Sequence, residues 1–242
     1  MNQSLFIIPF YNEEKRIPHS EFIDGFARYH DIDFLLVNDG SVDKTQEILN
    51  DFASKFANVS VLNLEKNSGK AEAIRKAILQ SRDLNYSSFG YLDADLSTPI
   101  SEIIRLLEFS KANPNLQIVM GTRIKLLGNS VVRSSKRHYF GRIFATIISN
   151  FILETAVYDT QCGAKIIKSE VAVSLFEKEF RTKWLFDVEM LLRLKKRAGK
   201  LEGIVAEIPL TTWIEKGNTK IKLKEFISFP VQLIMIYFRD AE

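Results

Sequence analysis

The chain has 242 residues, of which 46% are hydrophobic and 26% are charged, a composition typical of a globular protein that can bury a core. Its net charge of +3 is too small to indicate nucleic-acid binding, and its single cysteine excludes an internal disulfide and a cysteine-based zinc site. The N-terminal stretch MNQSLFIIPF lacks a positively charged leader. We therefore interpret it as a first strand rather than a signal peptide, and we do not expect export.

Strand-length apolar runs alternate with helix-like stretches in the first half of the chain. We expect strands at Leu5–Phe10, Phe34–Val37, Val59–Leu64, Phe89–Leu92 and Leu116–Met120. The stretches KTQEILNDFASKF and KAEAIRKAILQ between them have helical periodicity. This alternation predicts an α/β fold with a mostly parallel sheet flanked by helices. Because no repeat or linker divides the sequence, we expect a single domain over residues 1–242.

The second half of the chain departs from this alternation. The basic stretch RIKLLGNSVVRSSKRHYFGR is followed by the apolar stretch IFATIISNFIL. We expect a short strand at Ala164–Ile167, a helix at Trp184–Ala198 and a last strand near Gly203–Pro209. Residues 216–242 begin with a basic lead-in to an apolar segment, Phe226–Phe238, which is too short to span a membrane as a helix.

Each of the first four expected strands leads into a polar motif. The motifs are PFYNEE, NDGS, EKNSGKAEA and DADLS. The carboxyl ends of parallel strands meet at one edge of an open sheet, where such sheets bind their ligands, so we expect the ligand site there. No G-x-G-x-x-G follows the first strand, and no P-loop signature is present. A nucleotide would therefore be bound without a Gly-rich phosphate cradle.

Asp39 in NDGS has two interpretations. Asn, Asp, Gly and Ser are the residues that turns prefer, so this carboxylate could simply stabilise a turn. Its position at a strand end, beside other polar motifs, favours instead a ligand role in which Asp39 hydrogen-bonds a base or a ribose.

Asp93 and Asp95 stand one residue apart at the end of the fourth strand, just before a helix start at Thr98–Pro99. Alternate side chains of a strand share a face, so both carboxylates can point at one spot. They could cap the helix or form salt bridges. The sharper interpretation is a site for Mg²⁺ or Mn²⁺, since these ions prefer one or two carboxylates together with substrate phosphates and water.

Eight motifs together resemble a known family over nearly the whole chain. They are PFYNEEKRI, VNDGSVDKT, NSGKAEAIR, DADLSTP, GTR, DTQCGAKI, WLFDVEMLLR and TTWIEKGNTK. In this order they resemble inverting glycosyltransferases of the GT-A fold, and within these the dolichyl-phosphate β-glucosyltransferase and polyprenyl-phosphate glycosyltransferase group. The first four motifs imply a sugar-nucleotide donor. The narrower pair, DTQCG followed by WLFDVE, implies a lipid-phosphate acceptor.

The resemblance implies a role for individual residues. Asp95 would be the main metal ligand, with Asp93 nearer the ribose or the metal. Arg123 and Arg137 would face phosphate, Arg137 that of the acceptor. The residues expected to bind the donor are Pro9, Tyr11, Glu13 and Asp39 around the nucleoside, Lys70 in the third motif, and Lys220 beside the diphosphate.

The acceptor decides whether a general base is needed. A phosphate monoester, with a second pKa of about 6, is already largely ionised at neutral pH and can attack the anomeric carbon without one. A sugar hydroxyl would need a base, for which Asp187 or Glu189 in FDVE are the candidates. The alternative is that Trp184, Phe186 and Glu189 merely serve helix packing with an exposed charge.

Basic residues precede both apolar segments of the second half. Lys216, Lys220, Lys222 and Lys224 precede the C-terminal one, and Arg133, Lys136, Arg137 and Arg142 precede IFATIISNFIL. Basic residues beside an apolar face suit an anionic bilayer surface, although a core helix is the alternative for the C-terminal segment. We expect a cytoplasmic protein that contacts the cytoplasmic membrane face peripherally.

The sequence thus predicts an enzyme that transfers a hexose, glucose from UDP-glucose, to a polyprenyl or dolichyl phosphate. Two alternatives stay open. One is transfer to a saccharide hydroxyl in cell-surface polysaccharide assembly, and the other is a non-catalytic protein that binds nucleotide-sugars.

Overall fold

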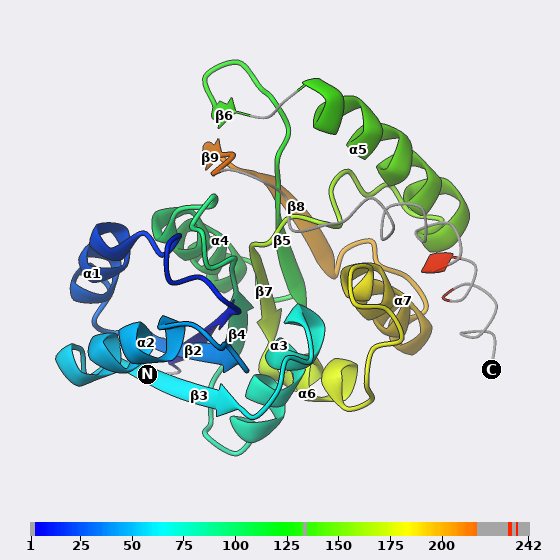
Figure 1. Cartoon of the computed structure of the whole chain (residues 1–242). Coiled ribbons are helices and arrows are strands. Elements are labelled where there is room, and N and C mark those ends of the chain that lie inside the picture. The colour runs from blue at the N-terminus through cyan, green and yellow to red at the C-terminus, as the bar shows by residue number, and fades with distance from the viewer. Residues whose placement is uncertain (1–2, 133–134, 217–231, 234–235, 237–242) are drawn as a thin grey trace.

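The computed structural model describes residues 3–132, 135–216, 232, 233 and 236, with only the backbone of residues 135–140 (Figure 1). Residues Arg133, Lys220, Lys222 and Lys224 lie outside this part of the chain, as do the side chains of Lys136 and Arg137. The expectations that rest on them stay predictions.

Nine described strands form two sheets. They are β1 (Ser4–Phe10), β2 (Asp33–Asp39), β3 (Val59–Leu64), β4 (Ser88–Tyr91), β5 (Ile118–Thr122), β6 (Ser130–Val132), β7 (Lys165–Lys168), β8 (Val205–Pro209) and β9 (Thr212–Ile214). The central sheet has seven strands in the order β3-β2-β1-β4-β7-β5-β8, and β6 pairs separately with β9. Every neighbouring pair is parallel except those that β7 makes with β4 and β5. The expected mostly parallel sheet is confirmed.

Helices cover both faces of this sheet (Figure 1). They are α1 (His19–Arg28), α2 (Thr45–Lys55) and α4 (Ile100–Ala112) on one face, and α3 (Lys70–Gln80), α6 (Ser169–Phe176) and α7 (Phe186–Ala198) on the other. Helix α5 (Ser135–Ile147) runs into a π-helix, η1 (Ile148–Leu153), which packs against α7. Side chains alternate along β1, so Phe6 and Ile8 enter one apolar cluster while Leu5 and Ile7 enter the other.

Aromatic rings dominate the cluster under α1 and α2. Phe26 lies 5.0 Å from Phe34 and 5.5 Å from Phe22, measured between ring centroids, and Phe22 lies 5.9 Å from Phe52. Aromatic pairs of this kind add about 0.5–1.5 kcal/mol each beyond their burial. These ring contacts help to pack α1 and α2 against β1 and β2, the strands that are followed by the first two polar motifs.

The expected strands match the observed ones to within about two residues, and the helix expected at Trp184–Ala198 begins at Phe186. Two features lay beyond the sequence reasoning. The short β6–β9 pair was not expected, and nothing in the sequence indicated that β7 runs antiparallel to its neighbours.

The described part of the C-terminal segment belongs to the core. Leu233 and Ile236 are buried in the cluster that includes α7. Lys216, expected among the membrane-facing lysines, instead pairs with Glu21 of α1 at 2.5 Å between Nζ and Oε2. At these positions the contacts agree with the core-helix alternative.

Gly90 in β4 tests the packing of β4 on β1, because a Cβ there would lie 2.2 Å from the ring of Phe6, its cross-strand partner. We predict that Gly90→Ala lowers the free energy of unfolding by about 1–3 kcal/mol, as overpacking does. Phe6→Leu should also destabilise the protein alone but partly rescue Gly90→Ala, because it removes the clashing atoms. Urea denaturation of the unaltered chain, the two single variants and the double variant measures these free energies of unfolding. Strictly additive losses would contradict the clash.

Candidate active site

The loop after β4 places Asp93 and Asp95 at the edge of the sheet where β1 to β4 end. Its backbone makes a tight turn in which the Leu96 amide donates to the Asp93 carbonyl at 3.1 Å. Leu96 has a φ of +48°, a left-handed conformation that is costly for a side chain of this kind. The Ser97 amide donates to Oδ1 of Asp95 at 2.9 Å. The turn therefore holds both carboxylates in a fixed relation.

Each of these two carboxylates faces a basic side chain of the chain itself. Oδ1 of Asp93 lies 2.5 Å from Nζ of Lys70, and Oδ2 of Asp95 lies 3.9 Å from Nη2 of Arg16. Burial alone would raise the pKa of Asp93, but the nearby Lys70, with smaller help from Arg123, lowers it below its ordinary value. Asp93 is therefore ionised at neutral pH.

The two carboxylates suit a hard divalent cation. The side chains of Asp93 and Asp95 are 43% and 24% exposed, so both can be reached from solvent. No cluster of three or more His, Cys, Asp or Glu side chains that could hold a metal occurs among the described residues. An ion here would thus complete its coordination with phosphate oxygens or water, as Mg²⁺ and Mn²⁺ do.

The segment after residue 158 closes against Asp93. A Cβ on Gly163 would lie 2.0 Å from Oδ2 of Asp93, so only glycine permits this approach. The neighbouring Cys162 is buried, and burial raises the pKa of its thiol to about 11. Cys162 is therefore protonated at neutral pH and is not a nucleophile.

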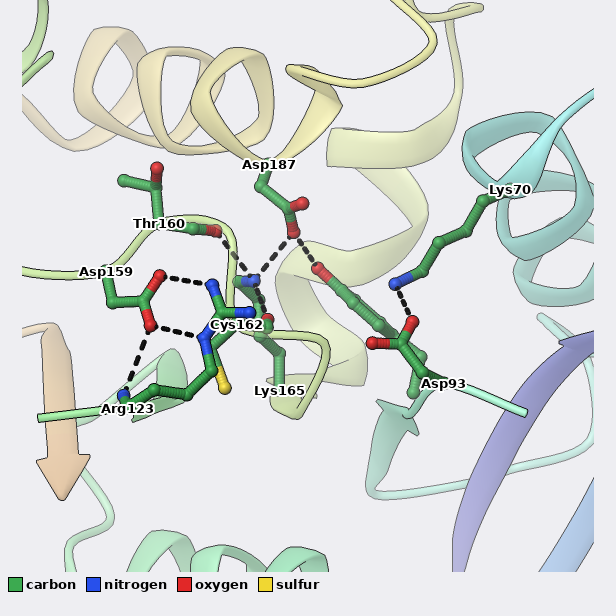
Figure 2. A network of polar contacts seen from close by, with 9 residues as sticks. Lys70, Asp93, Arg123, Asp159, Thr160, Cys162, Lys165 and Asp187 are labelled. Atoms are coloured by element: carbon green, nitrogen blue, oxygen red, sulfur yellow. Dashed lines mark hydrogen bonds and ion pairs between the residues drawn. The ribbon is translucent and has the colours of Figure 1, made fainter. Parts of the chain in front are cut away.

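Arg123, at the end of β5, is held by Asp159 of the same segment. Its Nε and Nη2 reach the two carboxylate oxygens at 2.7 and 2.8 Å, and its backbone amide donates to Oδ2 at 3.1 Å (Figure 2). Glu207 of β8 in turn accepts from the amides of Tyr158 and Asp159. Arg123 also lies over the ring of Trp213, 5.5 Å from its centroid. The guanidinium is therefore fixed in place.

A wholly buried network lies behind Asp93 and joins β4, β7 and α7. Nζ of Lys165 lies 2.7 Å from Oδ1 of Asp187 and donates to the carbonyls of Thr160 and Cys162 at 2.9 and 2.6 Å (Figure 2). The hydroxyl of Tyr91 donates to the same oxygen of Asp187 at 2.5 Å. Burial, followed by the charge of Asp187, raises the pKa of Tyr91 well above its ordinary value. The phenol therefore stays protonated.

These contacts bear on the two candidate bases. Asp187 is buried against Lys165 and Tyr91. Glu189 is buried as well, and its carboxylate accepts from Nη2 of Arg193 at 2.7 Å and from the amide of Arg181 at 2.9 Å. Both carboxylates face protein partners. The packing interpretation expected an exposed charge at Glu189, and this part of it is wrong because the side chain is buried against Arg193.

The residues expected around a nucleoside lie on the loops after β1 and β2. Pro9 is in β1, Tyr11 is exposed, and Glu13 is buried. The carboxylate of Asp39 is buried too, and its two oxygens accept from the amides of Ser68 and Gly69 at 2.8 and 2.7 Å. Asp39 thus ties the end of β2 to the start of α3, a structural task close to its turn interpretation. Contact with a base or ribose stays a proposal.

Several residues of the site were missed from the sequence. They are Arg16, Tyr91, Asp159, Gly163, Lys165 and Glu207. Lys165 did carry a signal, because a lysine at the start of a buried apolar strand must find an opposite charge. Of the other expected residues, the side chain of Arg137 and the whole of Lys220 lie outside the described part of the chain.

Comparisons with known proteins identify the family and support the fold. The model of glycosyl transferase family 2 matches residues 5–176. The chain is 33% identical over 250 residues to dolichyl-phosphate β-glucosyltransferase ALG5C of Trichomonas vaginalis, covering 97% of this chain and 71% of the relative. It is 28% identical over 250 residues to the dolichyl-phosphate β-glucosyltransferase of Mus musculus, covering 96% and 74%.

A solved structure supports the GT-A fold. Glucosyl-3-phosphoglycerate synthase from Mycobacterium tuberculosis, crystallised with Mn²⁺ and UDP-glucose, superposes with a TM-score of 0.71 at 18% identity over 99% of this chain and 79% of that one. The GT-A fold expected from the sequence is thereby confirmed. The match to the family model over most of the chain shows that the protein is a glycosyltransferase that belongs to glycosyl transferase family 2.

Proposed function

We propose that this chain transfers glucose from UDP-glucose to dolichyl phosphate or a related polyprenyl phosphate, with inversion at the anomeric carbon. The observation that carries the proposal is the similarity to dolichyl-phosphate β-glucosyltransferases along 97% of the chain. It extends beyond the family match, which ends at residue 176, and so includes the part of the chain that contributes α7 and β8.

Asp93 and Asp95 would hold the divalent ion, Mg²⁺ or Mn²⁺, whose charge offsets that of the donor diphosphate when bound. Their separation by one residue, their exposure and their acidic oxygens fit such an ion. The Mn²⁺ and UDP-glucose in the crystals of the mycobacterial synthase support the same ion and donor here. Lys70, which lies beside Asp93, and the exposed Tyr11 would contact the donor.

The state of Asp187 favours a phosphate acceptor. A hydroxyl acceptor needs a general base within reach, and Asp187 is buried in an ion pair with Lys165. A phosphate acceptor is already ionised and needs only cationic groups to bind it. Arg123, fixed by Asp159 beside Asp93, is one such group, and we assign Arg137 of α5 as another.

A lipid acceptor requires the enzyme to approach a bilayer. Within the described chain, no helix has both the length and the apolar character needed to cross one. Ile143, Ile147 and Phe151 recur at every fourth position along α5 and η1 and are 60%, 38% and 67% exposed. We propose that this apolar stripe, with the basic residues around it in the sequence, rests on the cytoplasmic membrane face.

Transfer itself is the first test. With UDP-glucose, dolichyl phosphate in detergent and Mn²⁺ or Mg²⁺, we expect a glucosyl phosphate lipid of β configuration, detected by mass spectrometry and NMR, and no product with EDTA. Asp95→Asn should lower turnover by about a hundredfold or more, because metal stabilisation of charge is worth several kcal/mol. The exposed Asp51→Asn on α2 is the matched control. Glucose on a saccharide hydroxyl but not on the lipid would refute the proposed acceptor.

The apolar stripe is tested by vesicle flotation. We expect the double change Ile143→Ser and Phe151→Ser to weaken binding to anionic vesicles by about tenfold or more, since burying one such side chain contributes about 1.5–3 kcal/mol. Leu84→Ser provides the control, because Leu84 is about equally exposed but lies in the connection between α3 and β4, outside α5 and η1. Equal binding of the double variant and the control variant would place membrane contact elsewhere.

A further inference from the structure

The carboxylate of Asp93 already has a cation. Nζ of Lys70, the first residue of α3, lies 2.5 Å from its Oδ1 and 5.7 Å from the centre of the Tyr91 ring (Figure 2). The ammonium therefore occupies one oxygen of a proposed metal ligand.

Two of the other nearby cations are held by acids that are not proposed metal ligands. Arg123 is bound by Asp159 through two hydrogen bonds, and the buried Lys165 pairs with Asp187. Arg16 stands 3.9 Å from Asp95 and 3.5 Å from Glu13, a longer and shared contact. Of these four basic residues, Lys70 therefore has the shortest contact with either proposed metal ligand.

The main chain at Lys70 is fixed by contacts that do not involve the Lys70 side chain. Asp39 fastens the amides of Ser68 and Gly69, and Gly40 has a φ of +65° and approaches residue 66 too closely for a Cβ. These contacts determine where α3 begins. The lysine side chain beyond that point is a flexible four-carbon stem with a single charged end, so its ammonium can change partners without movement of the helix.

A divalent ion that approached Asp93 without a nucleotide would meet the ammonium of Lys70. Like charges at such distances repel strongly in a site that is partly withdrawn from water. A metal that arrives with a nucleoside diphosphate brings anionic oxygens to which the ammonium can turn. The change of partners then keeps every charge compensated.

We propose that Lys70 is a positioning residue that holds Asp93 until the donor arrives, so that free metal binds weakly and metal and nucleotide bind together. This inference rests on the proposed metal-dependent nucleotide-sugar donor. It implies two effects of opposite sign when the ammonium is removed. Affinity for the metal alone rises, because its competitor is gone, and affinity for the nucleotide falls, because the diphosphate loses a cation.

The test measures binding rather than turnover. Free Mn²⁺ is followed by electron paramagnetic resonance and UDP by calorimetry, with the full chain and each ligand alone and together. For Lys70→Met we expect Mn²⁺ alone to bind more tightly and UDP more weakly, each by about 5- to 150-fold, the usual range of coupling between sites. The factor by which each of Mn²⁺ and UDP raises the affinity for the other should be smaller in this variant than in the unaltered chain.

Two variants control for charge and for structure. Lys70→Arg keeps the cation and should restore weak binding of free Mn²⁺. Lys55→Met removes the same charge from an exposed pair on α2, where Nζ lies 2.6 Å from Asp51, and should change nothing. Lys70→Gln, which keeps a polar end in the partly exposed site, repeats the test if the methionine variant fails to fold.

Other results would overturn the inference. If Lys70→Met and the unaltered chain bind free Mn²⁺ equally, or if the variant weakens both ligands, Lys70 does not compete with the metal. Absence of Mn²⁺ binding even with UDP would remove the metal assignment and the inference with it. If the expected binding changes occur but no glucosyl lipid forms, the inference stands and the proposed acceptor fails.

Discussion

The ammonium of Lys165, which has no exposed surface, holds together the side of the candidate site that contains Asp159, Gly163 and Asp187. It binds two carbonyls of the segment that contains Asp159 and Gly163, and it pairs with Asp187 of α7. Removal of one partner from such a pair leaves an uncompensated buried charge, at a cost of about 3–5 kcal/mol. The position of Gly163 against Asp93, and of Asp159 against Arg123, therefore depends on an interaction that never touches solvent.

Exposure separates the acidic residues of the site into two groups. Asp159, Asp187 and Glu189 are buried and are bound by arginine or lysine, so they hold other groups in place. Asp93 and Asp95 are open to solvent and sit on a turn strained at Leu96. Strain of this kind persists only where the surrounding structure enforces it, and it is common where a ligand binds. Their exposure to solvent therefore supports the proposal that Asp93 and Asp95 bind the metal.

The sequence predicted the parts that depend on local pattern and missed those that depend on distant partners. Apolar runs located the strands, and the polar motifs after β1 to β4 located the edge of the site. Nothing local reveals that β7 runs antiparallel or that a lysine on it neutralises Asp187 more than 20 residues away. From the sequence, Asp187 was accordingly a candidate general base. Asp39 was expected to bind a ligand, although its carboxylate accepts hydrogen bonds from the amides of Ser68 and Gly69 at the start of α3.

In the proposed function, Arg123 and Lys70 would present positive charge to phosphate in two different ways. Arg123 is fixed by a bidentate contact to Asp159, whose backbone is fixed by Glu207, so its orientation is set before any ligand arrives and little further entropy is lost on binding. Lys70 has one contact at the end of a flexible stem. A planar guanidinium that is fixed in advance suits recognition of an acceptor of constant shape, as proposed for Arg123. An ammonium that can exchange partners suits a binding step in which it leaves one anion for another, as proposed for Lys70. An arginine at position 123 thus suits a charge that keeps its place, and a lysine at position 70 suits a charge that moves between partners.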